Sequence, residues 1–193
     1  MRVIAGNAKG MKLLAPEGDK VRPSSDLLRG ALMSQLGAYF DGESMLDVCA
    51  GTGAMAIEFL SRGCGHAVAI EVDPVAVAVL EHNARHTRLR DAMEVLVGPA
   101  EQHLQKLAGQ QRQFDYIFLD PPWQAGLYQP LLDLIVRGQL LAPAGQLIVE
   151  SPKGLPVALW EGRLVQLSSR RYGSAYLERF ETPLATAGME PKS

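Results

Sequence analysis

Short apolar runs alternate with longer amphipathic stretches between residues 44 and 150. The short runs are rich in branched and aromatic residues, which is typical of buried strands in a parallel sheet. We predict strands at residues 45–49, 67–71, 93–97, 114–119 and 145–150. We predict helices at residues 54–62, 74–87, 100–107 and 127–138. This alternation is typical of an α/β fold with a doubly wound, mostly parallel sheet.

The two ends of the chain follow other patterns. Residues 163–168 and 175–180 are strand-like, and the connection through residues 170–174 is too short for a crossover helix, so we predict an antiparallel pair. Near the N-terminus, residues 24–36 have a mostly apolar helical face.

Before that helix, short apolar pairs stand between glycines and lysines, which indicates an arm outside the core, with a possible hairpin. We therefore expect an N-terminal arm at 1–22, one domain at 23–182 and a flexible tail at 183–193.

Bulk composition limits the class of protein. A chain of 193 residues with 47% hydrophobic residues can form one domain with a substantial core. Its apolar runs are too short to span a membrane and its start lacks a signal-peptide core, so we expect a cytoplasmic protein. The two cysteines, Cys49 and Cys64, fit neither a metal spacing nor a disulfide framework. We predict no metal site, and we expect Cys49 to be a small buried residue.

The net charge of −2 does not by itself suggest a nucleic-acid-binding protein. Its distribution is more informative, because the first 30 residues carry six basic side chains against three acidic ones. The basic ones are Arg2, Lys9, Lys12, Lys20, Arg22 and Arg29. Such a patch can guide a phosphate backbone even when the total charge is slightly negative. The alternative is a solvated surface with a few extra lysines.

The tetrad Asp120-Pro121-Pro122-Trp123 directly follows one predicted strand. Prolines lack an N–H and force the preceding residue into an extended conformation, so a stiff loop should leave the carboxyl end of the sheet, where ligands bind. The Asp120 carboxylate and the Pro121 carbonyl could each accept one N–H of a planar amine. Trp123 offers a face for base stacking, worth roughly 1–3 kcal/mol. The alternative is a rigid turn with a packed aromatic residue.

A glycine-rich loop, residues 50–56, follows the first strand and opens its helix. Its Gly-x-Gly-x-x-Ala spacing, with Glu71 in the next strand, fits two cofactor classes. A nicotinamide cofactor would place its pyrophosphate at the helix N-terminus and its ribose on Glu71. S-adenosylmethionine has no phosphate but carries an ammonium and a sulfonium. Asp47 suits that ammonium and has no clear use near a pyrophosphate, although it could instead cap a helix or stabilise a turn.

Residues 46–54, with Glu71 and the tetrad at 120–123, resemble class I S-adenosylmethionine-dependent methyltransferases that modify exocyclic amines. The chain more closely resembles the RsmD family of 16S ribosomal RNA guanine-N2 methyltransferases. The segments that carry this resemblance are 2–6, 9–13, 22–29, 60–63 and 172–174. The tetrad is shared by many amine methyltransferases, whereas the N-terminal pattern narrows the family.

The resemblance implies a Rossmann-like methyltransferase fold and methyl transfer from S-adenosylmethionine to a guanine N2 amine. The implied catalytic residues are Asp120, Pro121, Pro122 and Trp123. The implied cofactor-binding residues are Asp47, Ala50, Gly51, Thr52, Gly53, Glu71, Val72 and Ala100. The implied RNA contacts are Arg2, Lys9, Lys12, Arg22 and Arg29. The implied partner is 16S rRNA or an assembly intermediate of the small ribosomal subunit, and we expect a monomer that needs no metal.

The sequence departs from the family pattern at two positions. Gly30 stands where the family usually has Glu, and a glycine inside a helix costs about 1 kcal/mol relative to alanine. Pro99 stands where an Asp or Asn usually accepts the adenine amine. The Ala100 N–H, apolar contacts or Glu101 must then hold the adenine. We expect cofactor binding to be weaker than in relatives that have the acid.

Three rival functions remain open from the sequence. The same tetrad could serve an amine methyltransferase that acts on adenine N6, cytosine N4 or a protein glutamine. A nicotinamide-dependent dehydrogenase fits the glycine loop, but not Asp47 or the two prolines. A non-catalytic RNA-binding module is disfavoured by the intact Asp120 and the intact glycine loop.

Overall fold

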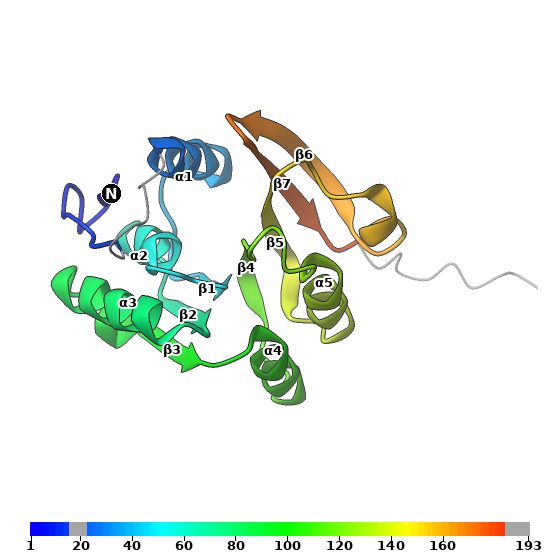
Figure 1. Ribbon diagram of the computed structural model, residues 1–193, viewed down its shortest axis with the longest axis horizontal. Coiled ribbons are helices and arrows are strands. Elements are labelled where there is room, and N and C mark those ends of the chain that lie inside the picture. The colour runs from blue at the N-terminus through cyan, green and yellow to red at the C-terminus, as the bar shows by residue number, and fades with distance from the viewer. Residues whose placement is uncertain (16–22, 184–193) are drawn as a thin grey trace, which may run out of the picture.

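The computed structural model describes residues 1–15 and 23–183 and shows a seven-stranded sheet in the order β3-β2-β1-β4-β5-β7-β6 (Figure 1). The strands are β1 Ser44–Val48, β2 His66–Glu71, β3 Met93–Val97, β4 Phe114–Leu119, β5 Leu141–Ser151, β6 Val165–Tyr172 and β7 Ala175–Glu181. The helices are α1 Pro23–Leu36, α2 Ala54–Ser61, α3 Pro74–His86, α4 Ala100–Gly109 and α5 Tyr128–Arg137. Strands β1 to β5 are parallel, and β7 runs antiparallel between β5 and β6. The predicted doubly wound α/β fold is therefore confirmed.

Two hydrophobic clusters cover the two faces of the sheet. One cluster contains the buried side chains of α1, α2 and α3, and the other contains those of α4 and α5. The strand order reverses between β1 and β4, which is the switch point where open α/β sheets bind ligands. None of the helices within residues 1–15 and 23–183 is long and apolar enough to cross a membrane.

Two strand boundaries differ from the prediction. Strand β5 begins at Leu141, because Leu141 pairs with Phe114 ahead of a break in the register. Ala144 in this break has a positive φ of 62°. The strand is irregular there, so the sequence does not show the continuous apolar run expected of a buried strand. Strand β6 continues to Tyr172, so only Gly173 and Ser174 connect the hairpin, rather than residues 170–174. Two residues are sufficient because Gly173 adopts a φ of 61°.

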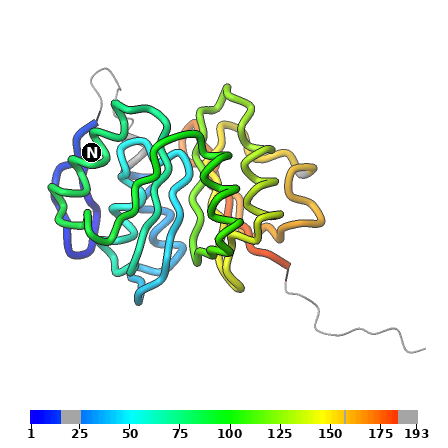
Figure 2. Tube along the Cα trace, turned by 90° about the horizontal axis from the view of Figure 1, so that it is seen from below, coloured from blue at the N-terminus to red at the C-terminus, as the bar shows by residue number. Residues whose placement is uncertain are grey.

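The first fifteen residues lie at the end of the molecule opposite the segment that joins β5 to β6 (Figure 2). They fold back on themselves through an antiparallel bridge between Arg2 and Lys12. The prediction that they stand outside the core is wrong, because Val3, Ala8 and Leu13 are buried in the larger cluster.

A buried carboxylate fastens this N-terminal arm to α2. Glu58 is 1% exposed and accepts the N–H groups of Ile4 and Ala5 at 2.9 and 3.1 Å. The same carboxylate pairs with the Arg62 guanidinium at 2.7 Å. The arm is therefore held by hydrogen bonds to a charged group as well as by apolar packing, and such bonds each contribute about 1.5–3 kcal/mol.

Gly6 lies where the arm touches α2. Its φ is 82°, and an added Cβ would lie 1.7 Å from the Ser61 carbonyl oxygen. We expect Gly6→Ala to lower the free energy of unfolding by roughly 1–3 kcal/mol, because the arm must move to relieve the overlap. Gly10→Ala is the matched control, since its φ of 83° imposes the same strain but its Cβ would meet nothing within 4 Å. Equal effects in urea denaturation would contradict this reading.

Gly30 lies inside α1, and the structure gives no steric reason for a glycine there. An added Cβ would meet only the Ile4 Cδ1 atom, at an ordinary 3.7 Å. We expect Gly30→Ala to raise the free energy of unfolding by about 0.5–1 kcal/mol, because alanine has the higher helix propensity. Chemical denaturation measures the change, and a less stable variant would contradict the prediction.

Candidate functional site

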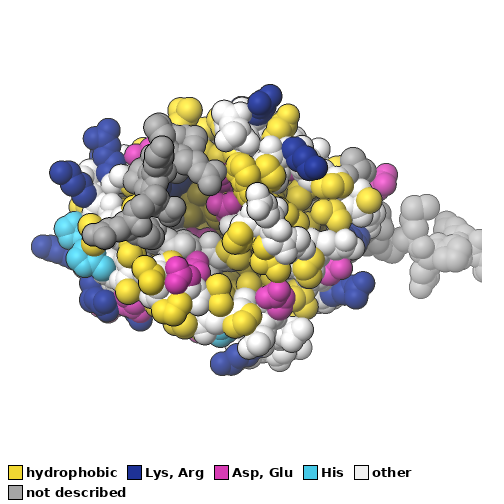
Figure 3. All heavy atoms as spheres, viewed as in Figure 1, with side chains coloured by type: hydrophobic (Ala, Val, Ile, Leu, Met, Phe, Trp, Pro, Cys, Tyr) yellow, Lys and Arg dark blue, Asp and Glu magenta, His cyan; other side chains and the backbone are white. Residues whose placement is uncertain are grey.

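A cavity of about 970 Å³ opens at the carboxyl ends of the parallel strands. Its size suits a drug-sized or nucleotide-sized ligand. One wall is formed by the glycine loop and the ends of β1 and β2, and another by the tetrad that follows β4. Figure 3 shows the hollow, with acidic side chains inside it and apolar side chains around it. The structure thus brings the two sequence motifs together in one space.

The glycine loop is built from left-handed backbone conformations. Cys49, Gly51 and Gly53 have φ values of 66°, 54° and 74°. A Cβ on Gly53 would lie 2.8 Å from the Leu80 Cγ atom, so a larger residue would push α2 away from α3. Cys49 is only half-buried and lines the cavity, which corrects the expectation of a buried packing residue.

Asp47 lies almost fully buried beneath this loop, with 1% of its surface exposed. Its Oδ2 atom accepts the Ala56 N–H in the first turn of α2 at 3.2 Å, so the helix-capping alternative is correct as a description of the free protein. The side chain also lines the cavity. Burial raises the pKa of Asp47 to about 7, the Ala56 N–H opposes the rise, and the charge of Glu71 adds to it. A cationic ligand would favour its ionised form.

Glu71 at the end of β2 is held rigidly by backbone donors. Its carboxylate accepts the N–H groups of Gly51 at 2.7 Å, Val72 at 2.8 Å and Asp73 at 2.9 Å. These bonds join the glycine loop to the start of α3. They also leave little acceptor capacity, since a carboxylate has about four lone-pair sites.

The tetrad leaves β4 without regular structure and enters a turn at Trp123, which the Ala125 N–H closes on the Pro122 carbonyl oxygen at 3.0 Å. Pro121 is buried and Pro122 is exposed, while Asp120 and Trp123 are half-buried. Trp123 packs against the larger hydrophobic cluster and also lines the cavity. Trp123 can therefore be both a packed aromatic residue and a stacking surface for a base, because one face of the indole ring can pack while the other faces the cavity.

Tyr128 is a neighbour of this site that the sequence analysis missed. Its hydroxyl donates to the Glu150 carbonyl oxygen at 2.8 Å and so ties α5 to the end of β5. Burial raises the pKa of Tyr128, and the nearby charge of Asp120 adds to the rise. No sequence signal marks it, since a tyrosine at a helix start is ordinary.

Acidic groups dominate the cavity. Asp47, Glu71, Glu101, Asp120 and Glu150 line it, against one cation, Arg29, among the described residues. Burial, together with the nearby carboxylate charges, raises the pKa of the Cys49 thiol to about 12. A negative cavity attracts a cationic cofactor and repels a pyrophosphate, which disfavours the nicotinamide alternative.

The structure contradicts the prediction that Arg29 meets RNA phosphates. Its side chain is 2% exposed and donates to the Arg2 carbonyl oxygen and the Asp26 carboxylate, both at 2.8 Å. Its Nε atom lies 3.7 Å from Glu58. Arg29 therefore fixes α1 to the N-terminal arm. Of the other predicted RNA contacts, Arg2, Lys9 and Lys12 are exposed on that arm, and Arg22 lies outside the described residues.

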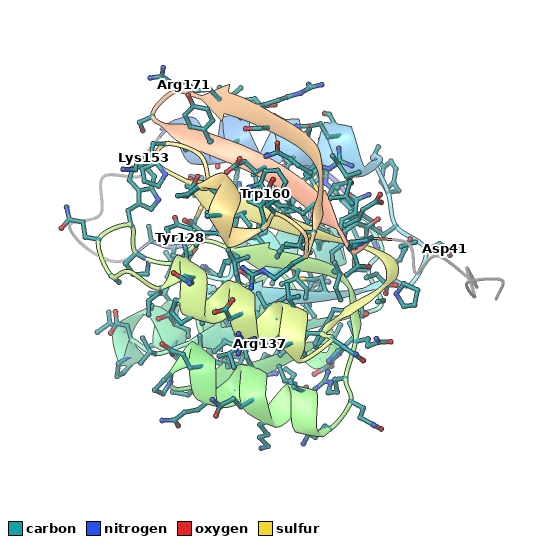
Figure 4. All side chains as sticks on the ribbon, turned by 90° about the vertical axis from the view of Figure 1, so that its right-hand side faces the viewer. Asp41, Tyr128, Arg137, Lys153, Trp160 and Arg171 are labelled. Atoms are coloured by element: carbon teal, nitrogen blue, oxygen red, sulfur yellow. The ribbon has the colours of Figure 1, made fainter. Side chains whose placement is uncertain are left out.

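A second group of exposed cations lies beyond the end of β5 and at the tip of the β6–β7 hairpin. We call Lys153, Arg170 and Arg171 the hairpin cations. Figure 4 shows Lys153 and Arg171 toward the same side of the molecule as Tyr128 at the start of α5, whereas Arg137 lies at the other end of that helix. The sequence pattern predicted that Arg170 and Arg171 lie in a connector between two strands. The signal that could have found them is their position beside the Tyr172-Gly173-Ser174 segment.

Comparisons with known proteins agree with this geometry. A family model described as conserved hypothetical protein 95 matches residues 1–181. The chain is 34% identical to the putative rRNA methyltransferase YlbH of Bacillus subtilis, over 90% of this chain and 94% of the relative. It is 30% identical to ribosomal RNA small subunit methyltransferase D of Escherichia coli K12, over 81% of this chain and 78% of the relative.

Solved structures show the same fold. The putative methyltransferase yhhF from Escherichia coli has a TM-score of 0.81 and 28% identity, covering 94% of this chain and 97% of its own. A putative methyltransferase solved in complex with SAH, SMU.776, has a TM-score of 0.67 and 13% identity, covering 81% of this chain and 49% of its own. The second likeness is one of fold alone.

Proposed function

The chain belongs to the RsmD family of S-adenosylmethionine-dependent methyltransferases, and we propose that it methylates the N2 amine of a guanine in 16S ribosomal RNA of the small subunit. The observation that carries the proposal is the single acidic cavity lined by both the glycine loop and the Asp120–Trp123 tetrad. The substrate assignment draws on relatives that are named rRNA methyltransferases.

The residues of the cavity fit S-adenosylmethionine. The ionised Asp47 carboxylate suits the ammonium of the methionine portion, and Gly51 and Gly53 let the backbone approach it closely. Glu71, at the edge of the second strand, already accepts three backbone N–H groups, and its remaining acceptor site suits one ribose hydroxyl. Ala50, Thr52, Val72 and Ala100 line the same space. When bound, the cofactor supplies an electrophilic methyl group on a sulfonium.

The tetrad would prepare the amine for direct displacement, with no covalent enzyme intermediate. The lone pair of an exocyclic amine is delocalised into its ring. The Asp120 carboxylate and the Pro121 carbonyl can each accept one N–H and so hold the nitrogen in a reactive orientation. Positioning of this kind supplies most of the rate in such a reaction.

The charge of the cavity restricts how RNA can enter it. Phosphates are repelled by the acidic lining, so the base alone enters, and it must first be unstacked or flipped. Trp123 would stack on the guanine. We assign the flanking phosphates to Arg2, Lys9 and Lys12 on the N-terminal arm, and to the hairpin cations on the opposite side.

The hairpin cations provide a test of this arrangement. We expect the double variant Lys153→Ala and Arg171→Ala to raise the KM for the RNA substrate and to reduce the salt dependence of binding by about two phosphate contacts, one for each cation. Cofactor affinity should stay unchanged. Arg137→Ala, an exposed arginine at the other end of α5 from Tyr128 (Figure 4), is the matched control. An equal effect of both variants on KM would contradict the assignment.

The chain has no excess of basic residues, with 19 Lys and Arg against 21 Asp and Glu, which suggests that the substrate is assembled with proteins. We infer that ribosomal proteins complete the binding surface, and that the enzyme acts as a monomer in the cytoplasm. Robust methylation of protein-free RNA would refute the first of these inferences.

The proposed function is tested by transfer of a radiolabelled methyl group to small ribosomal subunits, free 16S RNA and tRNA. Nucleoside mass spectrometry then identifies the product. We expect N2-methylguanosine in the small-subunit RNA. N6-methyladenosine, N4-methylcytidine or a methylated protein would retain the fold and the cofactor but overturn the substrate.

A further inference from the structure

With the ribose at Glu71, as in the proposed function on which this inference rests, the corner of the cavity beside Glu71 receives the adenine ring, because adenine is attached to the ribose. The Gly98 N–H donates to the Glu71 carbonyl oxygen at 2.9 Å, so the start of α4 lies directly beside the end of β2. Pro99, Ala100 and Glu101 line the cavity at this corner together with Glu71. Recognition of adenine therefore depends on the first residues of α4.

Adenine presents a donor and an acceptor at this edge, namely its 6-amine and its N1 atom. Pro99 can satisfy neither, because it has no N–H and no polar side chain. It caps α4 at φ −60° and ψ 133° without a side-chain hydrogen bond. The first N–H groups of the helix thus have no partner from the helix itself or from its cap. The Ala100 N–H is available for N1, but the amine still needs an acceptor.

Glu101 is the acceptor that this corner provides. It is half-buried in the first turn of α4, and it makes no ion pair or hydrogen bond with residues 1–15 or 23–183. Glu71 is a poorer candidate, because three backbone N–H groups already occupy its carboxylate. The charge of Glu101 also contributes to the raised pKa of Cys49, which places its carboxylate close to the cavity.

We propose that Glu101 accepts the adenine 6-amine of the cofactor and replaces the side chain that Pro99 lacks. Glu101 lies two positions further into the helix than position 99, where relatives carry Asp or Asn. Its side chain has one more methylene than aspartate, so it can reach back toward the same amine. A carboxylate in the first helical turn is also favoured by the helix dipole. Glu101 is then a residue that selects adenine over other purines.

A pair of ligands with equal charge isolates this contact. S-adenosylhomocysteine carries the 6-amine, whereas S-inosylhomocysteine carries a carbonyl there and an N–H at N1. At the 6-position a carboxylate accepts from the amine of the first ligand and repels the carbonyl oxygen of the second, while the N1–H of the second ligand opposes the Ala100 N–H in every variant alike. Glu101→Gln introduces an amide N–H that can donate to the carbonyl. The ratio of the two dissociation constants therefore reports on ring recognition and not on the net charge of the cavity.

Calorimetry on the full chain at pH 8 would measure both ligands with the wild type, Glu101→Gln and the exposed control Glu161→Gln. We expect the preference for S-adenosylhomocysteine to fall at least about tenfold in Glu101→Gln, the equivalent of one charge-assisted hydrogen bond, and to stay unchanged in the control. Glu101→Ala should weaken S-adenosylhomocysteine and relieve the repulsion of the inosine ligand, but without the added hydrogen bond that Glu101→Gln offers to the carbonyl. An unchanged preference in Glu101→Gln, whether the affinities stay equal or fall together, would overturn the proposal.

Discussion

Asp120→Asn should lower kcat for methyl transfer by about 10²–10³-fold, the usual cost of removing one preorganised polar contact to a transition state. Asparagine keeps one acceptor, its Oδ1 atom, but it loses the negative charge that strengthens the hydrogen bond as the amine nitrogen becomes positive in the transition state. The side chain keeps its size, so the tetrad and the half-buried Trp123 should keep their places. Single-turnover transfer to small ribosomal subunits would measure the effect.

Binding of S-adenosylhomocysteine separates this loss from a general disruption of the cavity. We expect its affinity in Asp120→Asn to match that of the wild type within error. Asp91→Asn is the control, since Asp91 is exposed and lies at the turn before β3. If the transfer rate stayed near the wild-type value, a role for the negative charge of Asp120 in methyl transfer would be excluded.

Asp47→Asn should weaken binding of S-adenosylmethionine by about 10–100-fold, because the ammonium loses a charge-assisted hydrogen bond. The same substitution should stabilise the free protein at pH 8 by about 1–3 kcal/mol, since it removes a buried charge that only one hydrogen bond satisfies. A substitution that weakens cofactor binding but stabilises the free protein would indicate that Asp47 serves ligand binding and not folding.

The pH dependence follows from the raised pKa of Asp47. The folded protein holds this proton up to about pH 7, whereas the unfolded chain releases it near 3.8. The stability of the wild type relative to Asp47→Asn should therefore fall as pH rises between these values, and level off above them. Cofactor affinity should rise over pH 6–8 in the wild type only, as the carboxylate ionises.

Denaturation and calorimetry across this pH range would measure both trends. Asp41→Asn, at an exposed position outside the cavity, is the control. A pH-independent difference in stability between the wild type and Asp47→Asn would show that Asp47 is already ionised in the free fold.

The parallel strands could be predicted from the sequence because strands covered on both faces appear as continuous apolar runs. Strand β5 was predicted too short, since the register break around Ala144 interrupts its run. The N-terminal arm was misjudged for a different reason. Its buried side chains are scattered among glycines and lysines, and the carboxylate that fastens them lies far along the chain, at Glu58.

Some features of the candidate site could likewise be predicted from the sequence, and others could not. The glycine loop and the tetrad could be predicted because each is a local motif at the end of a strand. The burial of Arg29 could not, because an arginine in a helix is usually exposed and its partners Arg2 and Glu58 are brought near only by the fold. Arg170 and Arg171 were missed because they were assigned to a connector, whereas pairing with β7 places them in strand β6.

The acidic lining of the cavity bears on turnover. Methyl transfer removes one positive charge from the cofactor, because the sulfonium becomes a neutral thioether. A cavity lined by Asp47, Glu71, Glu101, Asp120 and Glu150 therefore holds the spent cofactor less strongly than the methyl donor. We therefore expect S-adenosylhomocysteine to inhibit the enzyme only weakly. S-adenosylmethionine can then replace it in the cavity without a conformational change dedicated to product release.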